Sequence, residues 1–261
     1  MSTGLSFDSE MASGLEEQYR RPAMVLRRAR ALEHAAPQLG GSVVDVGSGP
    51  GFLTADLALG VGREGAVVGV DQSEAMVELA RARCRGLPQA RIDHGDATAL
   101  PLDDGSCDLV VSTQVLEYVA EVDRALDEMV RVLRPGGRVV LLATDWRSVA
   151  WHSSDDARMS RVLSAWEEHL AHPALPRTLG SQLEKRGMRV TEIDRYSIIE
   201  RAGDRLGYSA MLVGGIASFV PGHRGVTQEE ARAWAEDLEC LRERGETHYS
   251  VGQYFFCAEK V

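Results

Sequence analysis

The chain has 261 residues, of which 44% are hydrophobic and 26% are charged, and its formal net charge at pH 7 is −10. A chain of this length can bury a full core, and we expect one domain with appendages. The acidic balance argues against a nucleic-acid substrate, because binding a polyanion requires a basic face. The sequence opens without a charged and then apolar leader, and no apolar run approaches ~18 residues, so we expect a cytoplasmic protein with no membrane partner.

A run of arginines near the N-terminus is the local exception to this acidic balance. It comprises Arg20, Arg21, Arg27, Arg28 and Arg30. We interpret the run as a solvated helix face, as most charge runs are.

The cysteines show no metal-binding signature. Cys84, Cys107, Cys240 and Cys257 form no C-x-x-C pair, and no histidine lies at a spacing typical of metal ligands. We therefore expect reduced cysteines and no bound metal.

Hydrophobic periodicity predicts regular alternation in the first half of the chain. A helix is expected over 15–36, with Tyr19 on its apolar stripe. Strands are expected at 42–46, 66–70, 91–93, 107–112 and 138–144, and helices at 51–60, 73–84 and 121–132. The alternation predicts an α/β fold with a doubly wound parallel sheet, which binds its ligand outside the carboxyl ends of the strands.

The second half departs from this alternation. Helices are expected at 158–170, 178–186, 208–219 and 227–244, and strands at 189–199 and 249–258. The helix 208–219 is apolar nearly all round, which suits either a core helix or a dimer contact. We therefore expect a monomer or a homodimer.

A glycine turn after the first strand is the strongest functional signal. The stretch 43–54 reads as a buried strand, then Gly47, Gly49 and Gly51, then the start of a helix. Glycines allow positive φ and a close approach of the backbone to a ligand, and the helix N-terminus offers unpaired N–H groups. Asp71 ends the second strand 20 residues after Gly51, the spacing of a ribose-binding carboxylate. A nucleotide-like ligand is predicted, and these two features alone fit either NAD or S-adenosylmethionine.

Three later stretches decide between the two. They are 92–102 with Gly95 and Asp96, 106–112, and 130–142 with Arg134-Pro135-Gly136-Gly137. Together with the glycine turn, they make residues 40–145 resemble the class I S-adenosylmethionine-dependent methyltransferases. The likeness is greatest to the small-molecule branch that contains the ubiquinone and menaquinone C-methyltransferases. The arsenite enzymes of that branch are set aside, because residues 1–83 hold no cysteine.

The resemblance implies a role for each residue that matches these motifs. At the methionine part of the cofactor, the resemblance implies that Asp45 holds the turn, that Gly47, Ser48 and Gly49 pass under the ligand, and that Gln114 faces it. At the nucleoside part, it implies that Asp71 binds the ribose and that Gln72 and Met76 flank the adenine. Asp96 and Ala97 are implied to bind the edge of the adenine. It also implies a seven-stranded Rossmann-like sheet with an antiparallel last strand. We accordingly divide the chain into an N-terminal helical cap (1–39), a cofactor-binding core (40–145), and a completion of the sheet with helical acceptor-lid insertions (146–261).

Candidate acceptor residues follow the fifth strand and precede the last one. Trp146, Trp151 and Tyr249 are candidate substrate-binding aromatics, and His152 and His248 are candidate general bases. The alternative for both segments is a purely structural loop. Tyr19 is a candidate catalytic residue that contacts the sulfonium, or else a core residue, and Glu117-Tyr118 either lie beside the methyl group or start a helix.

The leading interpretation is a methyltransferase that acts on a small, partly aromatic metabolite, with carbon of an indole or quinone-like ring slightly preferred over nitrogen or oxygen. Specialised metabolism is the expected context. A binding protein or cyclase that keeps the cofactor without methyl transfer is the alternative, because the motifs specify binding and not chemistry. An NAD-dependent oxidoreductase is disfavoured, since Asp96 and the stretch 134–137 have no role in one.

Overall fold

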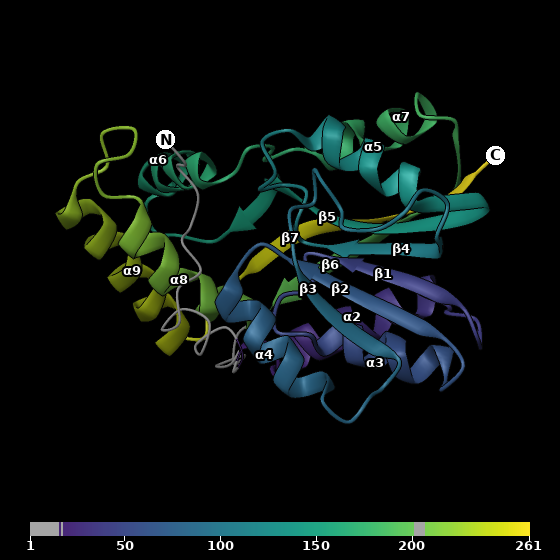
Figure 1. The fold of residues 1–261 in the computed structure, drawn as a ribbon. Helices are drawn as coiled ribbons and strands as arrows, with labels where there is room; N and C mark the ends of the chain where they lie inside the picture. Colours follow the sequence, from purple (N-terminus) through teal and green to yellow (C-terminus); the bar gives the residue numbers. More distant parts are fainter. Residues whose placement is uncertain (1–15, 17, 201–206) are drawn as a thin grey trace.

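The computed structural model describes residues 16, 18–200 and 207–261, and its centre is one seven-stranded sheet (Figure 1). The strands are β1 (Ser42–Val46), β2 (Ala66–Asp71), β3 (Ala90–His94), β4 (Cys107–Thr113), β5 (Leu133–Trp151), β6 (Met188–Glu200) and β7 (Tyr249–Lys260). Their order is β3-β2-β1-β4-β5-β7-β6, with β1 to β5 parallel and β7 antiparallel to both neighbours. The predicted doubly wound sheet with an antiparallel last strand is confirmed.

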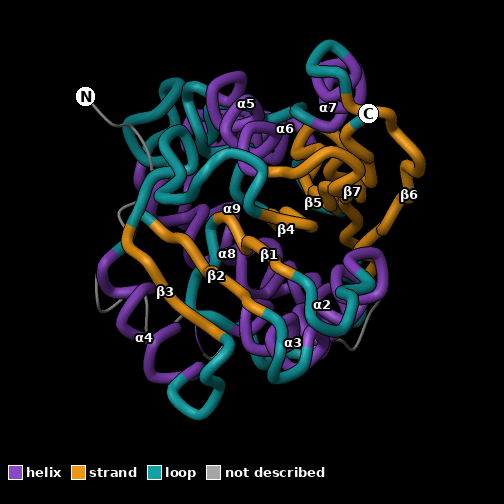
Figure 2. The backbone as a smooth tube through the Cα atoms, turned by 45° about the vertical axis from the view of Figure 1, so that its right-hand side comes forward, coloured by secondary structure: helices purple, strands orange, loops and turns teal. Residues whose placement is uncertain are grey.

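Helices cover both faces of the sheet (Figures 1 and 2). One face carries α2 (Pro22–Ala35), α3 (Phe52–Val61) and α4 (Glu74–Cys84), and the other carries α5 (Val122–Val132) and α7 (Pro176–Glu184). Each face has its own buried apolar cluster, because strands of a parallel sheet are covered on both sides. The carboxyl ends of β1, β2, β3 and β4 are thereby left at one edge, which is where such sheets bind ligands.

A third group of helices packs together beyond that edge. It consists of α6 (Asp156–Trp166), the short 3-10 helix η1 (Glu167–His169), α8 (Tyr208–Phe219) and α9 (Gln228–Glu243). Its apolar cluster is separate from those of the sheet and is rich in tryptophan and tyrosine, including the fully buried Trp234. This aromatic layer forms one wall of the cavity described below.

Several expected element boundaries are wrong, and two of them bear on the site. The predicted helix 15–36 is interrupted by a turn at 19–21, and α2 begins at Pro22, which suits the first position of a helix because its missing N–H has no helical partner there. Tyr19 consequently lies in the turn and not on a helical stripe; Leu15 lies outside the described residues. The fifth strand does not end at residue 144 but continues past an irregularity in register to Trp151, which pairs with Tyr249.

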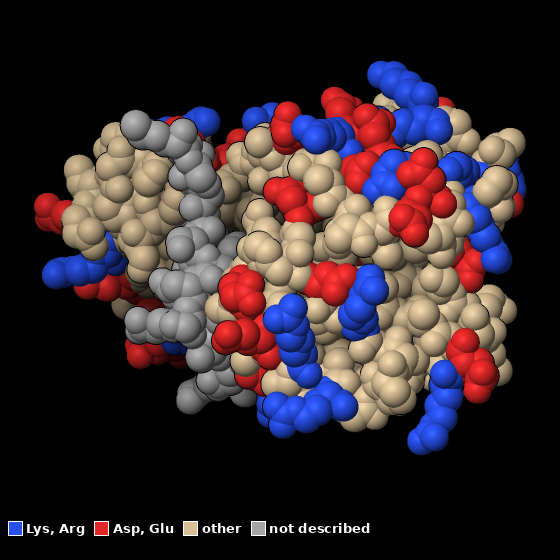
Figure 3. Space-filling view, in the orientation of Figure 1, with Lys and Arg blue, Asp and Glu red and all other residues tan. Residues whose placement is uncertain are grey.

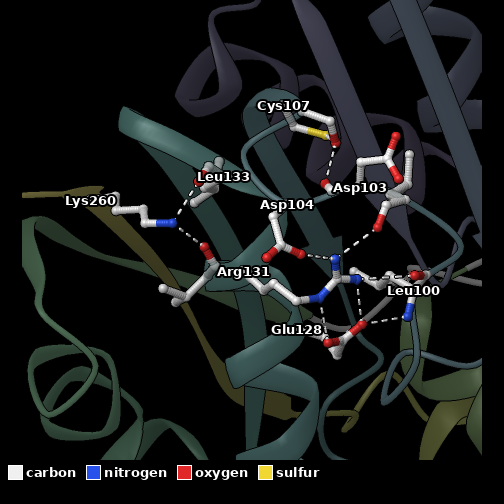
Figure 4. A network of polar contacts seen from close by, with 11 residues as sticks. Leu100, Asp103, Asp104, Cys107, Glu128, Arg131, Leu133 and Lys260 are labelled. Carbon is white, nitrogen blue, oxygen red and sulfur yellow. Dashed lines mark hydrogen bonds and ion pairs between the residues drawn. The ribbon is translucent and has the colours of Figure 1, made fainter.

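A polar network fixes the loop between β3 and β4 (Figure 4). Arg131 of α5 donates hydrogen bonds to the carbonyls of Leu100 and Leu102 and to the carboxylates of Asp104 and Glu128, and Glu128 accepts from Leu100 N. The loop that follows Asp96 is therefore held to the sheet domain by several charge-assisted contacts.

Two observations concern the nucleic-acid and membrane partners that the sequence argues against. Figure 3 shows acidic and basic side chains intermingled on the face that it presents. Among the described residues, no helix has both the length and the apolarity that a membrane crossing requires.

Candidate active site

The turn after β1 can be built only from glycine at its first position. Gly47 has φ of +73°, and a Cβ there would lie 2.1 Å from Cγ2 of Val115. Gly49 has φ of +52°, and its Cβ would meet Oη of Tyr19 at 3.5 Å. Gly47 N and Ser48 N both donate to the carbonyl of Val70 on the neighbouring strand. The backbone of the turn is thus fixed against β2, with Tyr19 beside it.

Asp71 anchors the same turn through its carboxylate. Oδ2 accepts from Gly49 N at 2.8 Å, and Oδ1 accepts from Ser73 N at 2.9 Å. Burial raises the pKa of Asp71 above its usual value, while these backbone donors oppose the increase. Each oxygen retains a further acceptor site, which the two hydroxyls of a ribose could fill.

Asp45 lies beneath the turn. Its Oδ2 accepts from Thr54 Oγ1 at 2.6 Å, which connects β1 to α3, and burial raises its pKa to about 7. Asp45 and Ser48 line a smaller adjoining cavity and not the main one. Asp45 and Ser48 therefore lie in or beneath the turn as predicted, but they support it from behind and do not line the main cavity.

Gln114 occupies a special backbone position just past β4, with φ of +60°. Its Oε1 accepts from Thr144 Oγ1 at 2.7 Å and from Gln253 Nε2 at 3.2 Å, and its Nε2 donates to Glu117 Oε1 at 3.2 Å. Glu117 is fully buried, accepts also from Thr144 N at 2.6 Å, and has its pKa raised by burial to about 7. Hydrogen bonds with Thr144 of β5, Gln253 of β7 and Glu117 in the segment before α5 therefore fix the Gln114 side chain at the cavity.

The main cavity has a volume of about 670 Å³ and contains most of the predicted cofactor residues. Those that line it are Tyr19, Gly47, Gly49, Asp71, Gln72, Met76, Asp96, Ala97 and Gln114. They come from the carboxyl ends of four strands, from the first turn of α4 and from the turn before α2. Sequence motifs separated by up to 95 positions thus meet at one surface.

The other end of the cavity is aromatic. Tyr118, Trp146, Trp166 and Tyr208 line it, together with Met211, Leu212 and Gly215 of α8. The rings of Trp146 and Trp166 meet edge to face at 6.3 Å, and their Nε1 atoms have no hydrogen-bond partner in the described structure. Those Nε1 atoms are buried away from the open space, so the walls offer flat apolar surfaces, which suit a flat apolar ligand.

His169 backs this aromatic wall. Its ring stacks on Trp166 at 3.6 Å and meets Trp146 at 5.8 Å, while Nδ1 contacts the carbonyl of Trp166. Burial lowers the pKa of His169 to about 4, because the charged imidazolium is disfavoured away from water. The ring is therefore neutral at pH 7 and stiffens the wall.

Arg27 is the functional residue that sequence reasoning missed. Its side chain lines the cavity, and the residue is only 9% exposed, although the arginine run was interpreted as a solvated face. Among the residues that the structure describes, nothing forms a hydrogen bond or an ion pair with it. A buried unpaired guanidinium is costly, so it favours an anion in the cavity. No local sequence signal marks it; only the fold turns this side of α2 inward.

Four predicted acceptor residues do not line the cavity. Because β5 continues to Trp151, the Trp151 ring packs in the core against Tyr249 at 4.8 Å and Trp234 at 5.6 Å. Tyr249 is fully buried behind Tyr208. His152 and His248 are exposed, joined only by a backbone hydrogen bond. The expectation of ligand contacts from these positions is corrected accordingly. Trp146 remains at the cavity, as does Tyr118, one of the two residues expected either beside the methyl group or at a helix start.

Comparisons with known proteins agree with this geometry. Residues 44–141 match a family model described as a methyltransferase domain. A demethylmenaquinone methyltransferase of Clavibacter sepedonicus is 40% identical over 116 residues, which are 44% of this chain and 46% of that protein. The chain spans less than half the length of the curated relatives it matches.

Two solved structures share the fold. A SAM-dependent methyltransferase from Aquifex aeolicus is similar with a TM-score of 0.56 at 19% identity, covering 98% of this chain and 100% of that one. A (4+2)-cyclase is similar with a TM-score of 0.59 at 21% identity, covering 91% of this chain and 81% of that one. At these identities the likeness establishes the architecture alone.

Proposed function

We propose that this chain, whose residues 44–141 match a family model described as a methyltransferase domain, is a class I methyltransferase that transfers a methyl group from S-adenosylmethionine to a small aromatic acceptor. One observation carries the proposal: Asp71 and the glycine turn form one end of a cavity whose other end is walled by Tyr118, Trp146 and Trp166. A nucleoside site and an aromatic site thus share one space.

The residues present fit the cofactor. Asp71 offers two carboxylate oxygens to ribose hydroxyls, and a Cβ at Gly47 would clash with Val115 in the turn that carries the ligand. Gln72 and Met76 would flank the adenine, while Asp96 and Ala97 would bind its edge. Gln114 would face the methionine end, as would Tyr19, whose ring suits a sulfonium through its negative face.

Arg27 would hold a carboxylate at the methionine end. It lines both the main cavity and the smaller one that contains Gly47 and Ser48, so it lies near the turn. Its guanidinium is buried without a partner among the described residues, and a carboxylate can accept two parallel hydrogen bonds from it. The methionine carboxylate of the cofactor is the anion that this position fits best.

The acceptor end favours a flat ring. Trp146, Trp166 and Tyr208 lie beyond residue 141, where the family match stops, whereas Tyr118 lies within it. We assign the helices of residues 146–261, chiefly α6 and α8, as the acceptor lid. Carbon methylation of an indole or quinone-like ring, in specialised metabolism and in the cytoplasm, is the more specific form of the proposal, with nitrogen or oxygen as the other acceptor atoms.

Positioning accounts for most of the proposed catalysis. The bound cofactor supplies an electrophilic methyl group on a sulfonium. The chain's task is to hold the acceptor in line with that group and to exclude water, which Tyr118, Trp146 and Trp166 do as buried apolar walls.

The test is incubation with methyl-labelled S-adenosylmethionine and a panel of indoles, quinones, phenols and amines, followed by mass spectrometry and NMR. A labelled product with release of S-adenosylhomocysteine supports methyl transfer and identifies the acceptor atom. Trp146→Ala serves as the matched acceptor-end variant: it should lower turnover while leaving the affinity for S-adenosylhomocysteine within about twofold, because Trp146 lies at the aromatic end.

A cofactor-binding protein or cyclase is the second candidate. The observation that favours it is the position of His152 and His248, which are exposed and do not line the cavity, so neither can serve as a base there. Tight cofactor binding without formation of S-adenosylhomocysteine across the panel would support this candidate over methyl transfer.

A further inference from the structure

A cluster of metal-ligating side chains lies away from the cofactor cavity, where α2 crosses the antiparallel strands. His34 comes from the last turn of α2, Glu192 from β6 and Cys257 from β7. One ligand atom from each lies within 4.8 Å of the other two. His34 Nδ1 is 3.8 Å from Cys257 Sγ and 3.6 Å from Glu192 Oε2.

The two separations from His34 are close to those of a tetrahedral zinc site. Zinc binds sulfur at about 2.3 Å and nitrogen or oxygen at about 2.0–2.2 Å, which puts neighbouring ligand atoms roughly 3.3–3.6 Å apart. The observed separations from His34 exceed that range by a few tenths of an ångström at most. The Glu192 side chain is half-exposed and can move toward the other two ligands, which are buried against the sheet.

Asp194 selects the nitrogen of His34 that faces the cluster. Its Oδ2 lies 3.1 Å from His34 Nε2, and a carboxylate can only accept, so Nε2 carries the proton and Nδ1 presents a lone pair to Cys257 and Glu192. Arg30 holds Asp194 in place through a bond of 2.7 Å. A carboxylate behind a histidine in this way is the usual support for a metal-bound imidazole.

Packing and charge also favour a bound cation. The His34 side chain is 6% exposed and lies on the ring of Phe255 at 4.5 Å, so its orientation is fixed. Two carboxylates converge on this imidazole, and Arg30 neutralises one of them. A dication bound by the thiolate would balance the remaining negative charge.

We propose that His34, Glu192 and Cys257 bind one zinc ion, with water at the fourth position on the solvent side. Binding forms a bond from the metal to Cys257 Sγ, and the thiol proton is released to solvent. The ion would tie α2 to β6 and β7. Since Arg27 lies seven residues before His34, about two turns along the same helix, the ion would also hold the helix that carries Arg27.

The test is zinc titration of the full chain after chelator treatment, in competition with a chromophoric chelator. One equivalent should bind, and cobalt in its place should give a thiolate-to-metal charge-transfer band. Cys257→Ser should abolish that band, and Asp194→Asn should weaken zinc binding 10- to 100-fold. Cys240→Ser is the matched control, since Cys240 is exposed and outside the cluster.

The same titration can overturn the proposal. Absence of stoichiometric binding would mean that His34 and its carboxylates form an ion pair only. If Cys257→Ser still binds zinc, and its cobalt-loaded form keeps the charge-transfer band, the metal lies elsewhere. Asp194→Asn, at a partly exposed position, provides a test if Cys257→Ser fails to fold. All these readouts measure metal binding, so they are independent of methyl transfer.

Discussion

Replacing Arg27 with methionine should separate the two ends of the cofactor. Methionine keeps an apolar side chain of comparable length on α2 while removing the guanidinium that lines the cavity. A hydrogen bond to a charged group contributes about 1.5–3 kcal/mol, or roughly 10- to 150-fold in affinity. The upper part of that range applies here, because Arg27 is only 9% exposed and water competes little for it.

Two ligands that differ in the carboxylate make this measurable by isothermal titration calorimetry. Arg27→Met should weaken S-adenosylhomocysteine but leave 5′-deoxy-5′-methylthioadenosine, which lacks the amino-acid part, unchanged. It should also raise the midpoint of thermal unfolding of the ligand-free protein, because it removes a buried cation that has no ion-pair partner among the described residues. Arg21→Met is the control at the N-cap of the same helix, since Arg21 does not line the cavity. Equal weakening of both ligands, or of neither, would refute a carboxylate site at Arg27.

Three further substitutions test the site. Asp71→Asn should weaken both of those ligands by a similar factor, on the order of tenfold or more in calorimetry, because both retain the ribose. Gly47→Ala should lower the free energy of unfolding by more than ~1 kcal/mol in urea titrations, owing to positive φ and the clash with Val115, whereas Gly86→Ala has open space and should not. Burial raises the pKa of Glu117 from about 4.5 to about 7, so the folded state holds a proton that the unfolded chain loses, and stability falls as pH rises through that window. Glu117→Gln keeps the hydrogen bonds that the side chain accepts but cannot ionise. The difference in free energy of unfolding between this variant and the parent should therefore shift by ~3 kcal/mol in favour of the variant between pH 4.5 and 8. A difference that does not change with pH would contradict the buried-acid reasoning.

The cofactor end was predictable because its determinants are local. Gly47 and Gly49 lie within one turn. Asp71 ends β2 and Asp96 follows β3, and the sequence pattern predicts both strands. A parallel sheet then brings the carboxyl ends of those strands to one edge without further information. Eleven predicted positions line the cavity. Nine of them are these four residues together with Gln72, Met76, Ala97, Gln114 and Tyr19, and the other two are Tyr118 and Trp146.

The acceptor end was not predictable in the same way. It combines Trp146 of β5, Trp166 of α6 and Tyr208 of α8, and nothing in their spacing indicates that they meet. The loop expected after residue 144 is strand instead, since pairing of Trp151 with Tyr249 extends β5 by hydrogen bonds that only the tertiary fold supplies. The histidine and cysteine of the proposed zinc site are likewise 223 positions apart, beyond any spacing rule.

Gln114 is where the local and the non-local halves of the site meet. Its backbone follows β4 in the motif region, but its side chain is held by Thr144 of β5 and Gln253 of β7. Because Glu117 bonds both Gln114 and the backbone of Thr144, a shift in the strand that leads to Trp146 would move the group expected to face the methionine. Acceptor shape and cofactor position are therefore coupled through one buried network, and changes to the aromatic wall should be tolerated best where they leave Thr144 and Gln253 in place.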